Sequence, residues 1–516
     1  MSTSFISSKK RHYAAESFKN AFSDRDRPIQ GYLFIGKHTP YANDEIIEEI
    51  SSSEVTDRVI WNDMICCKKI ADNSLEMVIP RVTWTEDTVY KQYDDTVELN
   101  ELLTGNSTVS PMYIINSGNQ VFKCINNNNG ANSTIQPDSQ SLTANGNTLT
   151  TDSYVWKYMY EVPELNAFST NTWIPAPSST EKVQYAANNS TAVDGELVTV
   201  VVINPGSGYI NDYITIDPFT SSCTRLTLSN PNNDVPKLSY KMGVSGDGIL
   251  NTTYITAIDT FEGTLDISYP TQSSGGGANT LYVFTRTEIV GDGEDVVANT
   301  VVTDGAITDI KVTNYGKNYT YANAVIYGTG TGAQTRIILP PKYGHSYDPA
   351  KELGAYNVML NINLGEIDSS EGGIISTSTK FRQYGILLNP CLYGTSTVVA
   401  NANSVISQTT HITVDEGIPY EKNEYVYQGT ISSPTFSGIV QEEDANNVVY
   451  LTNVKGTFVS PTVLKSANTN LSGRITRDIE YPAFEPYSGD ILYVNNILPI
   501  ERTNDQFENI KLIIKF

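Results

Sequence analysis

The sequence predicts a mainly β protein (α+β with few helices) that is built from several domains. The chain has 516 residues, and a typical domain size of ~100 to 200 residues predicts roughly three to four domains. It contains 36 Gly and 32 Tyr together with abundant Thr, Asn and Val, which are residues of short strands and tight turns. We therefore expect a β-sandwich-like or barrel-like scaffold that inserted β domains interrupt.

Two segments have the apolar spacing of a helix. Residues 11–22 repeat apolar side chains at helical intervals, among them Ala15 and Phe18. Residues 44–70 follow a possible cap at Asn43 or Asp44, and Ile46, Ile47 and Ile50 recur along one side.

Three short sequence strings, rich in apolar and aromatic residues and far apart in the chain, are predicted to be parts of one interrupted domain. They are residues 154–163 (YVWKYMYEVP), 381–390 (FRQYGILLNP) and 489–496 (GDILYVNN). The expected organisation is a scaffold in residues 1–189, 343–410 and 476–516, with β domains inserted at 190–342 and 411–475. The second insertion contains short alternating strands and predicts a small β-barrel or β-roll.

The first insertion contains an internal duplication. Residues 194–209 align without a gap to residues 304–319, an offset of 304 minus 194, or 110 residues. Each copy predicts a turn, a strand, a Gly turn and a buried tyrosine, Tyr209 or Tyr319, because glycine adopts the positive φ that folds the tyrosine back. The nearby GTGTG at 328–332 lacks the following helix and Lys-Ser/Thr of a phosphate loop, so we expect no nucleotide there.

Composition also limits the partners. The net charge is -23, which disfavours nucleic acid because binding to phosphates requires clustered Lys and Arg. No signal peptide and no apolar run approaching the ~18 residues of a membrane span is visible, so we expect no membrane partner and synthesis in a cytosol. The five cysteines show neither a disulfide framework nor metal-ligand spacing.

The sequence predicts no enzyme, no cofactor and no metal site. His12, His38, His345 and His411 share no local spacing, and we expect His345 and Ser207 to lie in loops without chemistry. Three acidic clusters could supply a glycosidase pair, although solvated surface is the better expectation in so acidic a chain. They are Asp44-Glu45 with Glu48-Glu49, Asp94-Asp95 and residues 442–444.

In two predicted strands, apolar side chains alternate with other residues and so lie on one face. Ile510, Leu512, Ile514 and Phe516 alternate with polar residues at the C-terminus. Trp156, Tyr158 and Tyr160 likewise share one face of a strand, for which core packing is the first interpretation and a subunit contact the second.

Taken in order and spacing, the scaffold strings resemble the baseplate wedge protein encoded by gene 8 of T-even-type contractile-tailed phages. The matching stretches are residues 78–84 (VIPRVTW), 154–163, 173–177 (WIPAP), 381–383 with 388–390, 489–493 and 508–516 (ENIKLIIKF). The duplicated insertion is similar to the Gly-Tyr repeat modules of tail and baseplate proteins of large phages. The structural or interface candidates are Trp84, Trp156, Tyr158, Tyr160, Tyr209, Tyr319, Phe381, Arg382 and Phe516.

The resemblance implies a virion protein of the tail baseplate, made in the bacterial cytoplasm. It implies a homodimer that bridges other baseplate wedge proteins, lies under the fibre-bearing periphery and helps to transmit the signal for sheath contraction. The alternatives are a receptor-binding or carbohydrate-binding tail protein and, less favoured, a glycan-degrading enzyme. The insertions depart from the family, so the resemblance implies no contact for them.

Overall fold

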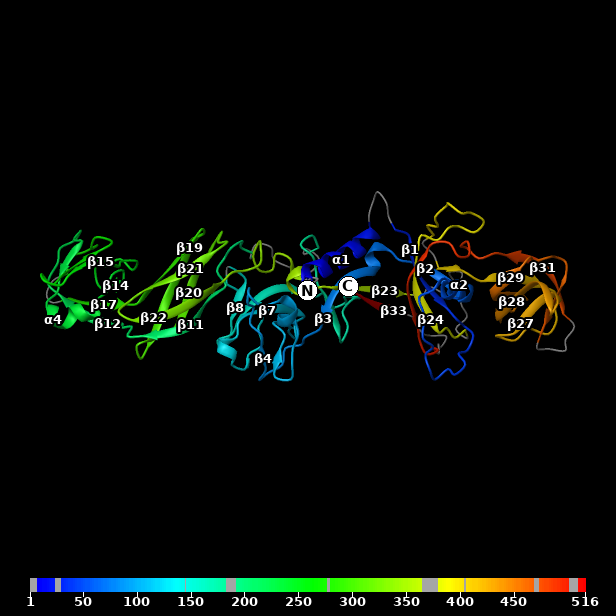
Figure 1. Cartoon of the computed structure of the whole chain (residues 1–516), viewed down its shortest axis with the longest axis horizontal. Helices are drawn as coiled ribbons and strands as arrows, with labels where there is room; N and C mark the ends of the chain where they lie inside the picture. Colours follow the sequence, from blue (N-terminus) through cyan, green and yellow to red (C-terminus); the bar gives the residue numbers. More distant parts are fainter. Residues whose placement is uncertain are drawn as a thin grey trace, which may run out of the picture. The chain divides into compact units, whose positions relative to one another are not determined.

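The computed structural model describes residues 7–23, 29–143, 145–181, 192–275, 279–363, 379–402, 405–467, 473–500 and 509–516. Strands far outnumber helices, which confirms the mainly β, multidomain class (Figure 1). The chain divides into two compact units, residues 1–78 with 356–516 and residues 79–355. Each unit is described separately.

The first unit contains a five-stranded antiparallel sheet that segments from distant parts of the chain build together. Its order is β25 (Val405–Ser407), β2 (Met64–Lys69), β1 (Gly31–Gly36), β24 (Gln383–Leu388) and β32 (Asp490–Asn496). The strings at 381–390 and 489–496 are thus neighbours, with Gln383 opposite Asn496. All of β1 is buried, which is why its side chains are apolar on both faces.

A second sheet of this unit contains the C-terminal strand. β23 (Asn357–Asn363) pairs with residues 75–78 of β3 (Leu75–Pro80) on one edge and with β33 (Asn509–Lys515) on the other. Leu512 is buried, whereas Ile510, Ile514 and Phe516 are half-buried. The Phe516 ring lies 5.4 Å from the ring of Phe18, so the last residue packs on the first helix.

Six strands of the first unit close into a barrel, which confirms the barrel expectation for the second insertion. The order around the barrel is β26 (Thr410–Val414), β29 (Val448–Gly456), β28 (Ser433–Glu443), β27 (Tyr425–Thr430), β30 (Val463–Ser466) and β31 (Arg474–Glu480). Because β31 closes the barrel against β26, the module extends beyond the expected end at 475. Its core includes Ile412, Phe436, Val440 and Leu451.

The helices agree with expectation only in part. α1 (Ser8–Ala21) matches the first predicted helix, with Ser7 as its N-cap. The prediction of one helix over 44–70 is wrong: Asp44 accepts from the Tyr41 amide, α2 (Glu54–Asp63) begins after the Ser53 cap, and β2 follows at once. Here strand pairing with β1 overrides the helical spacing.

The second unit begins with a four-stranded antiparallel sheet. Its order is β6 (Tyr113–Ile115), β7 (Gln120–Asn126), β9 (Val155–Glu161) and β8 (Asn147–Leu149). The short elements β4 (Val89–Tyr90), β5 (Val109–Ser110), α3 (Leu99–Leu103), β10 (Trp173–Pro175) and α5 (Pro349–Glu352) belong to the same unit. The string at 154–163 forms β9 here and pairs with local strands. It therefore lies in the second unit, whereas the other two strings lie in the first, although we expected all three in one interrupted domain.

The duplicated strands, β11 (Thr199–Ser207) and β20 (Ala306–Lys317), belong to a group of three strand pairs, and the opening turns of the two copies exchange hydrogen bonds. β11 pairs with β22 (Thr331–Ile338), β20 with β19 (Glu294–Thr303), and β18 (Arg286–Gly291) with β21 (Ala322–Tyr327). The opening turn of each copy binds the tyrosine of the other: Tyr319 N donates to Gly195 O at 3.1 Å, and Tyr209 N donates to Gly305 O at 3.0 Å. The copies therefore form an internal pseudo-symmetric pair.

Both tyrosines are buried, with 6% of each exposed. Gly206, at φ 64°, allows this in the first copy, because a Cβ there would lie 2.8 Å from the Tyr209 ring. Gly316 takes the same left-handed conformation, at φ 62°, before Tyr319. The expected sequence of turn, strand, Gly turn and buried tyrosine is present in each copy.

A further β module lies between the two copies. It contains β12 (Asp212–Ile216), β17 (Asn279–Phe284) and β14 (Gly243–Ser245) in one sheet, and β13 (Arg225–Thr227), β16 (Thr264–Ile267) and β15 (Ile255–Asp259) in another. The short helix α4 (Pro231–Asp234) follows β13. An apolar core that includes Ile216, Leu226, Met242 and Leu265 joins the two sheets. We call residues 212–284 the tip module.

Candidate functional site

A row of buried polar side chains crosses one face of the sheet in the second unit. Lys123 of β7 lies opposite Lys157 of β9, which in turn lies opposite Asn147 of β8. Residues directly opposite in antiparallel strands project to the same face, so these three side chains are neighbours. Both lysines are buried, Lys157 completely. Two adjacent ammonium groups are unfavourable at such a site without carboxylates.

The first carboxylate comes from the segment that follows the duplicated module. Lys123 Nζ donates to Glu352 Oε2 at 3.1 Å and lies 3.1 Å from His345 Nδ1. It also lies 4.0 Å from the centre of the Tyr93 ring, a cation–π distance. All four side chains are buried. His345 is therefore part of a buried ionic cluster, although it lies in a loop as expected.

The second carboxylate comes from the opening turn of the first duplicated copy. Lys157 Nζ lies 3.3 Å from Glu196 Oε1 and 2.5 Å from the backbone oxygen of Asn145. Glu196 Oε2 in turn accepts from Asn145 Nδ2 at 3.5 Å. Glu196 follows Gly195, so the same turn both enters the duplication and supplies the carboxylate.

Burial and charge perturb each group of this cluster. Burial lowers the pKa of Lys123 and of Lys157, although the neighbouring carboxylates oppose this. Burial and the Lys123 charge lower the pKa of His345 to about 3, so the imidazole is neutral. Burial raises the pKa of Glu196. For Glu352 burial acts in the same direction, but Lys123 and His345 outweigh it and lower the pKa to about 2.

The cluster fixes both ends of the inserted β modules to one sheet. Glu196 stands at the start of the insertion, and His345 and Glu352 stand just after its end. Lys123 and Lys157 lie on adjacent strands of the sheet that receives them. We call these five residues the junction clamp. Within the described residues no group of three or more His, Cys, Asp or Glu side chains is arranged to hold a metal ion.

The predicted aromatic residues lie mainly in cores. Trp156 and Tyr158 join the buried cluster of the second unit, against which the partly buried Trp84 packs while donating to Ser133 Oγ at 3.2 Å. The prediction that Tyr160 shares one face of the strand with Trp156 and Tyr158 is wrong. A bulge between Tyr158 and Tyr160 places Tyr160 opposite Val121, and its hydroxyl donates to Pro175 O at 2.8 Å.

Phe381 and Arg382 are also buried, in the first unit. Arg382 donates to both oxygens of Asp44, at 2.7 and 2.5 Å, and to His38 O at 2.6 Å. The hydrogen bonds from Arg382 lower the pKa of Asp44 to about 2. Arg382 thus holds the segment 38–44 against the sheet, a structural role that the string at 381–390 did not itself reveal.

The acidic clusters that could have supplied a glycosidase pair each contact an arginine. Asp44 pairs with Arg382, as described above. Arg336 donates to Asp94 and Asp95 at 2.5 and 2.8 Å. Arg474 lies 2.5 Å from Glu443, with both side chains buried. Each arginine neutralises the carboxylate that it contacts, as expected of structural ion pairs.

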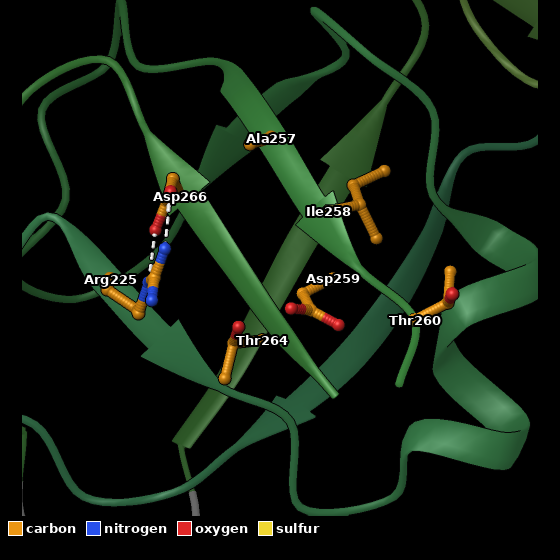
Figure 2. A pocket seen from close by; sticks show the side chains of 7 residues that line it. All are labelled: Arg225, Ala257, Ile258, Asp259, Thr260, Thr264 and Asp266. Atoms are coloured by element: carbon orange, nitrogen blue, oxygen red, sulfur yellow. Dashed lines mark hydrogen bonds and ion pairs between the residues drawn. The ribbon is translucent and has the colours of Figure 1, made fainter. Parts of the chain in front are cut away.

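The tip module carries a polar surface pocket of about 330 Å³ (Figure 2). Arg225 on β13 donates to both oxygens of Asp266 on β16, at 2.7 and 3.0 Å. The rest of the lining is Ala257, Ile258, Asp259, Thr260 and Thr264. Phe261 follows Thr260 in the hairpin turn and is 98% exposed.

Sequence reasoning missed the junction clamp. The available signal was one lysine in the middle of each of two otherwise apolar strands, QVFKCIN and VWKYMYE. A buried lysine requires a partner, but nothing in the sequence identifies Glu196 or Glu352 among the chain's many carboxylates.

Comparison with known proteins adds no relative. The chain matches no protein-family model and no curated protein. None of the helices in the described ranges is long and apolar enough to cross a membrane.

Proposed function

We propose that this protein is a structural wedge subunit of a contractile phage-tail baseplate. In this role it forms a homodimer, bridges neighbouring wedge proteins beneath the fibre-bearing periphery and transmits the signal for sheath contraction. The proposal rests on the resemblance of the scaffold strings. Several of these strings form strands of the two units. β9 and β24 are largely buried, which is where a shared fold would retain its sequence, and β33 is only partly buried.

The junction clamp is the structural observation that best supports a mechanical role. It ties both ends of a large insertion to the interior of one sheet through buried ion pairs. A bridging subunit has to pass displacement between neighbours, and an insertion held at both ends moves with its sheet. Several modest interfaces in a ring then act together, because binding of each neighbour raises the effective concentration of the next.

Genetic complementation tests the proposal. A phage that lacks this gene should regain infectivity and contractile tails with the full-length protein and with Ser207→Ala, whose side chain lies at the exposed end of β11. The protein truncated before Ile510 should fail, because β33 is lost. Loss of infectivity with Ser207→Ala in a protein that still folds and assembles would favour an enzyme instead.

The tip module favours carbohydrate binding as a second candidate function. Its pocket offers a planar Arg–Asp pair and threonine hydroxyls, and Tyr213, Tyr240 and Phe261 are more than half exposed. Aromatic faces and bidentate polar groups suit sugar rings. Specific binding of the full-length protein to a glycan array, abolished by Asp266→Asn, would favour this candidate. A blank array would favour the structural role alone.

A further inference from the structure

We propose that Lys157 and Asn145 form an intramolecular isopeptide bond, with Glu196 as the proton-transfer group and ammonia as the product. Lys157 Nζ, the nucleophile, lies 2.5 Å from the backbone oxygen of Asn145, the residue that carries the electrophile. Glu196 bridges the two reacting side chains. One carboxylate oxygen lies 3.3 Å from Lys157 Nζ, and the other lies 3.5 Å from Asn145 Nδ2, which is the leaving group.

The surroundings favour the neutral amine that such a reaction requires. The Lys157 side chain is completely buried and that of Glu196 nearly so. Lys123 lies directly across the strand pair and adds a like charge, which disfavours a second ammonium group. Transfer of one proton from Lys157 to Glu196 converts the buried ion pair into a neutral amine and a neutral acid. The directions of the pKa changes agree: burial lowers that of Lys157 and raises that of Glu196.

The carboxamide is also polarised toward attack. Thr143 Oγ donates a hydrogen bond to Asn145 Oδ1 at 2.6 Å. A donor at this oxygen stabilises the negative charge that develops there when the nucleophile adds to Cγ. Glu196, Lys157 and Thr143 thus supply the acid and base, the nucleophile and the oxyanion donor.

The reaction balances without an oxidant or a co-reactant. The Lys157 Nζ lone pair adds to Asn145 Cγ, and a Cγ–Nζ bond forms. The neutral Glu196 acid gives its proton to Nδ2 and takes one from Nζ, so the carboxyl group is again protonated at the end of the reaction. The Cγ–Nδ2 bond then breaks and ammonia leaves.

The product would join β9 covalently to the turn that leads into β8. This is the place where the opening turn of the insertion meets the sheet, so the bond would fix the strand and the turn that face Glu196. The inference rests on the geometry of the three side chains, and it stands or falls independently of the proposed function.

Intact-mass spectrometry of the denatured full-length protein tests the proposal. The expected mass is about 17 Da below that of the sequence, which corresponds to the loss of one ammonia. Tandem spectra should then identify one branched peptide that contains both Lys157 and Asn145. This measurement on the wild-type protein does not depend on the folding of any variant. A wild-type protein of full sequence mass would overturn the proposal.

Variants identify the reacting groups. Lys157→Arg keeps the positive charge but removes the nucleophile, and Glu196→Gln keeps the shape but removes the proton relay, so both should return to their sequence mass. Asn147→Ser, on the same polar row, should keep the loss. Because Gly146 follows Asn145, a cyclic imide at this site would also release ammonia. A loss that persists in Lys157→Arg and is reversed by mild base would identify the imide and refute the isopeptide bond.

Discussion

Replacing Glu352 by Gln should destabilise the second unit strongly, although the two side chains have nearly the same shape. The change removes the carboxylate that lies 3.1 Å from Lys123 Nζ, and 1% of the Lys123 side chain is exposed to water. Removing one partner of a buried ion pair typically costs about 3–5 kcal/mol, because the other charge is left in a medium of low polarity. That is a large part of the ~5–15 kcal/mol that stabilises a typical domain.

Denaturant unfolding followed by tryptophan fluorescence measures this effect. Of the four tryptophans, Trp84, Trp156 and Trp173 lie in the second unit, and Trp156 adjoins Lys157. The double variant Lys123→Met/Glu352→Gln should recover most of the loss, because no lysine charge then remains at this position.

The matched control is Asp266→Asn, which breaks the exposed Arg225–Asp266 pair and should leave the unfolding curve unchanged. A Glu352→Gln midpoint equal to that of the control, or a double variant as unstable as the single one, would refute the account of the clamp.

Three further predictions follow from the same structure. Deleting residues 190–342 removes Glu196, so the shortened protein should fold well only with Lys157→Met, as thermal unfolding of both versions would show. His345 and His38 have folded pKa values of about 3 and about 4, below the ordinary 6.5. The unfolded chain therefore binds protons first, stability should fall as the pH drops from 6.5 toward 3, and His345→Gln should flatten that dependence in denaturant titrations. Finally, analytical ultracentrifugation at micromolar concentration should show a homodimer, and a monomer throughout would contradict the assembly implied by the resemblance.

Local sequence features predicted the local structure well. The turn before each of Tyr209 and Tyr319 requires a positive φ, which glycine adopts readily, so the glycines in the sequence mark these turns. Both tyrosines are buried as expected. The short alternating strands between 411 and 475 likewise predicted a barrel. In both cases each turn or strand could be read from a few consecutive residues.

The features that depend on distant partners were not predictable in the same way. Residues 64–69 pair with β1, and this pairing overrides the helical spacing that extends to residue 70. The bulge that separates Tyr160 from Trp156 depends on register with β7, which the alternation of side chains does not encode. The junction clamp requires Lys157 to meet Glu196, 39 residues away, and Lys123 to meet Glu352, 229 residues away. Only the fold selects those partners.

Electron cryomicroscopy of contractile-tailed virions assembled with this chain tests the proposed wedge role most directly. The proposed role predicts density in the baseplate ring that fits both units of the chain, present as a dimer in contact with neighbouring wedge proteins. Absence of the chain from the purified virion, or its placement only at the tip of a fibre, would contradict a wedge subunit.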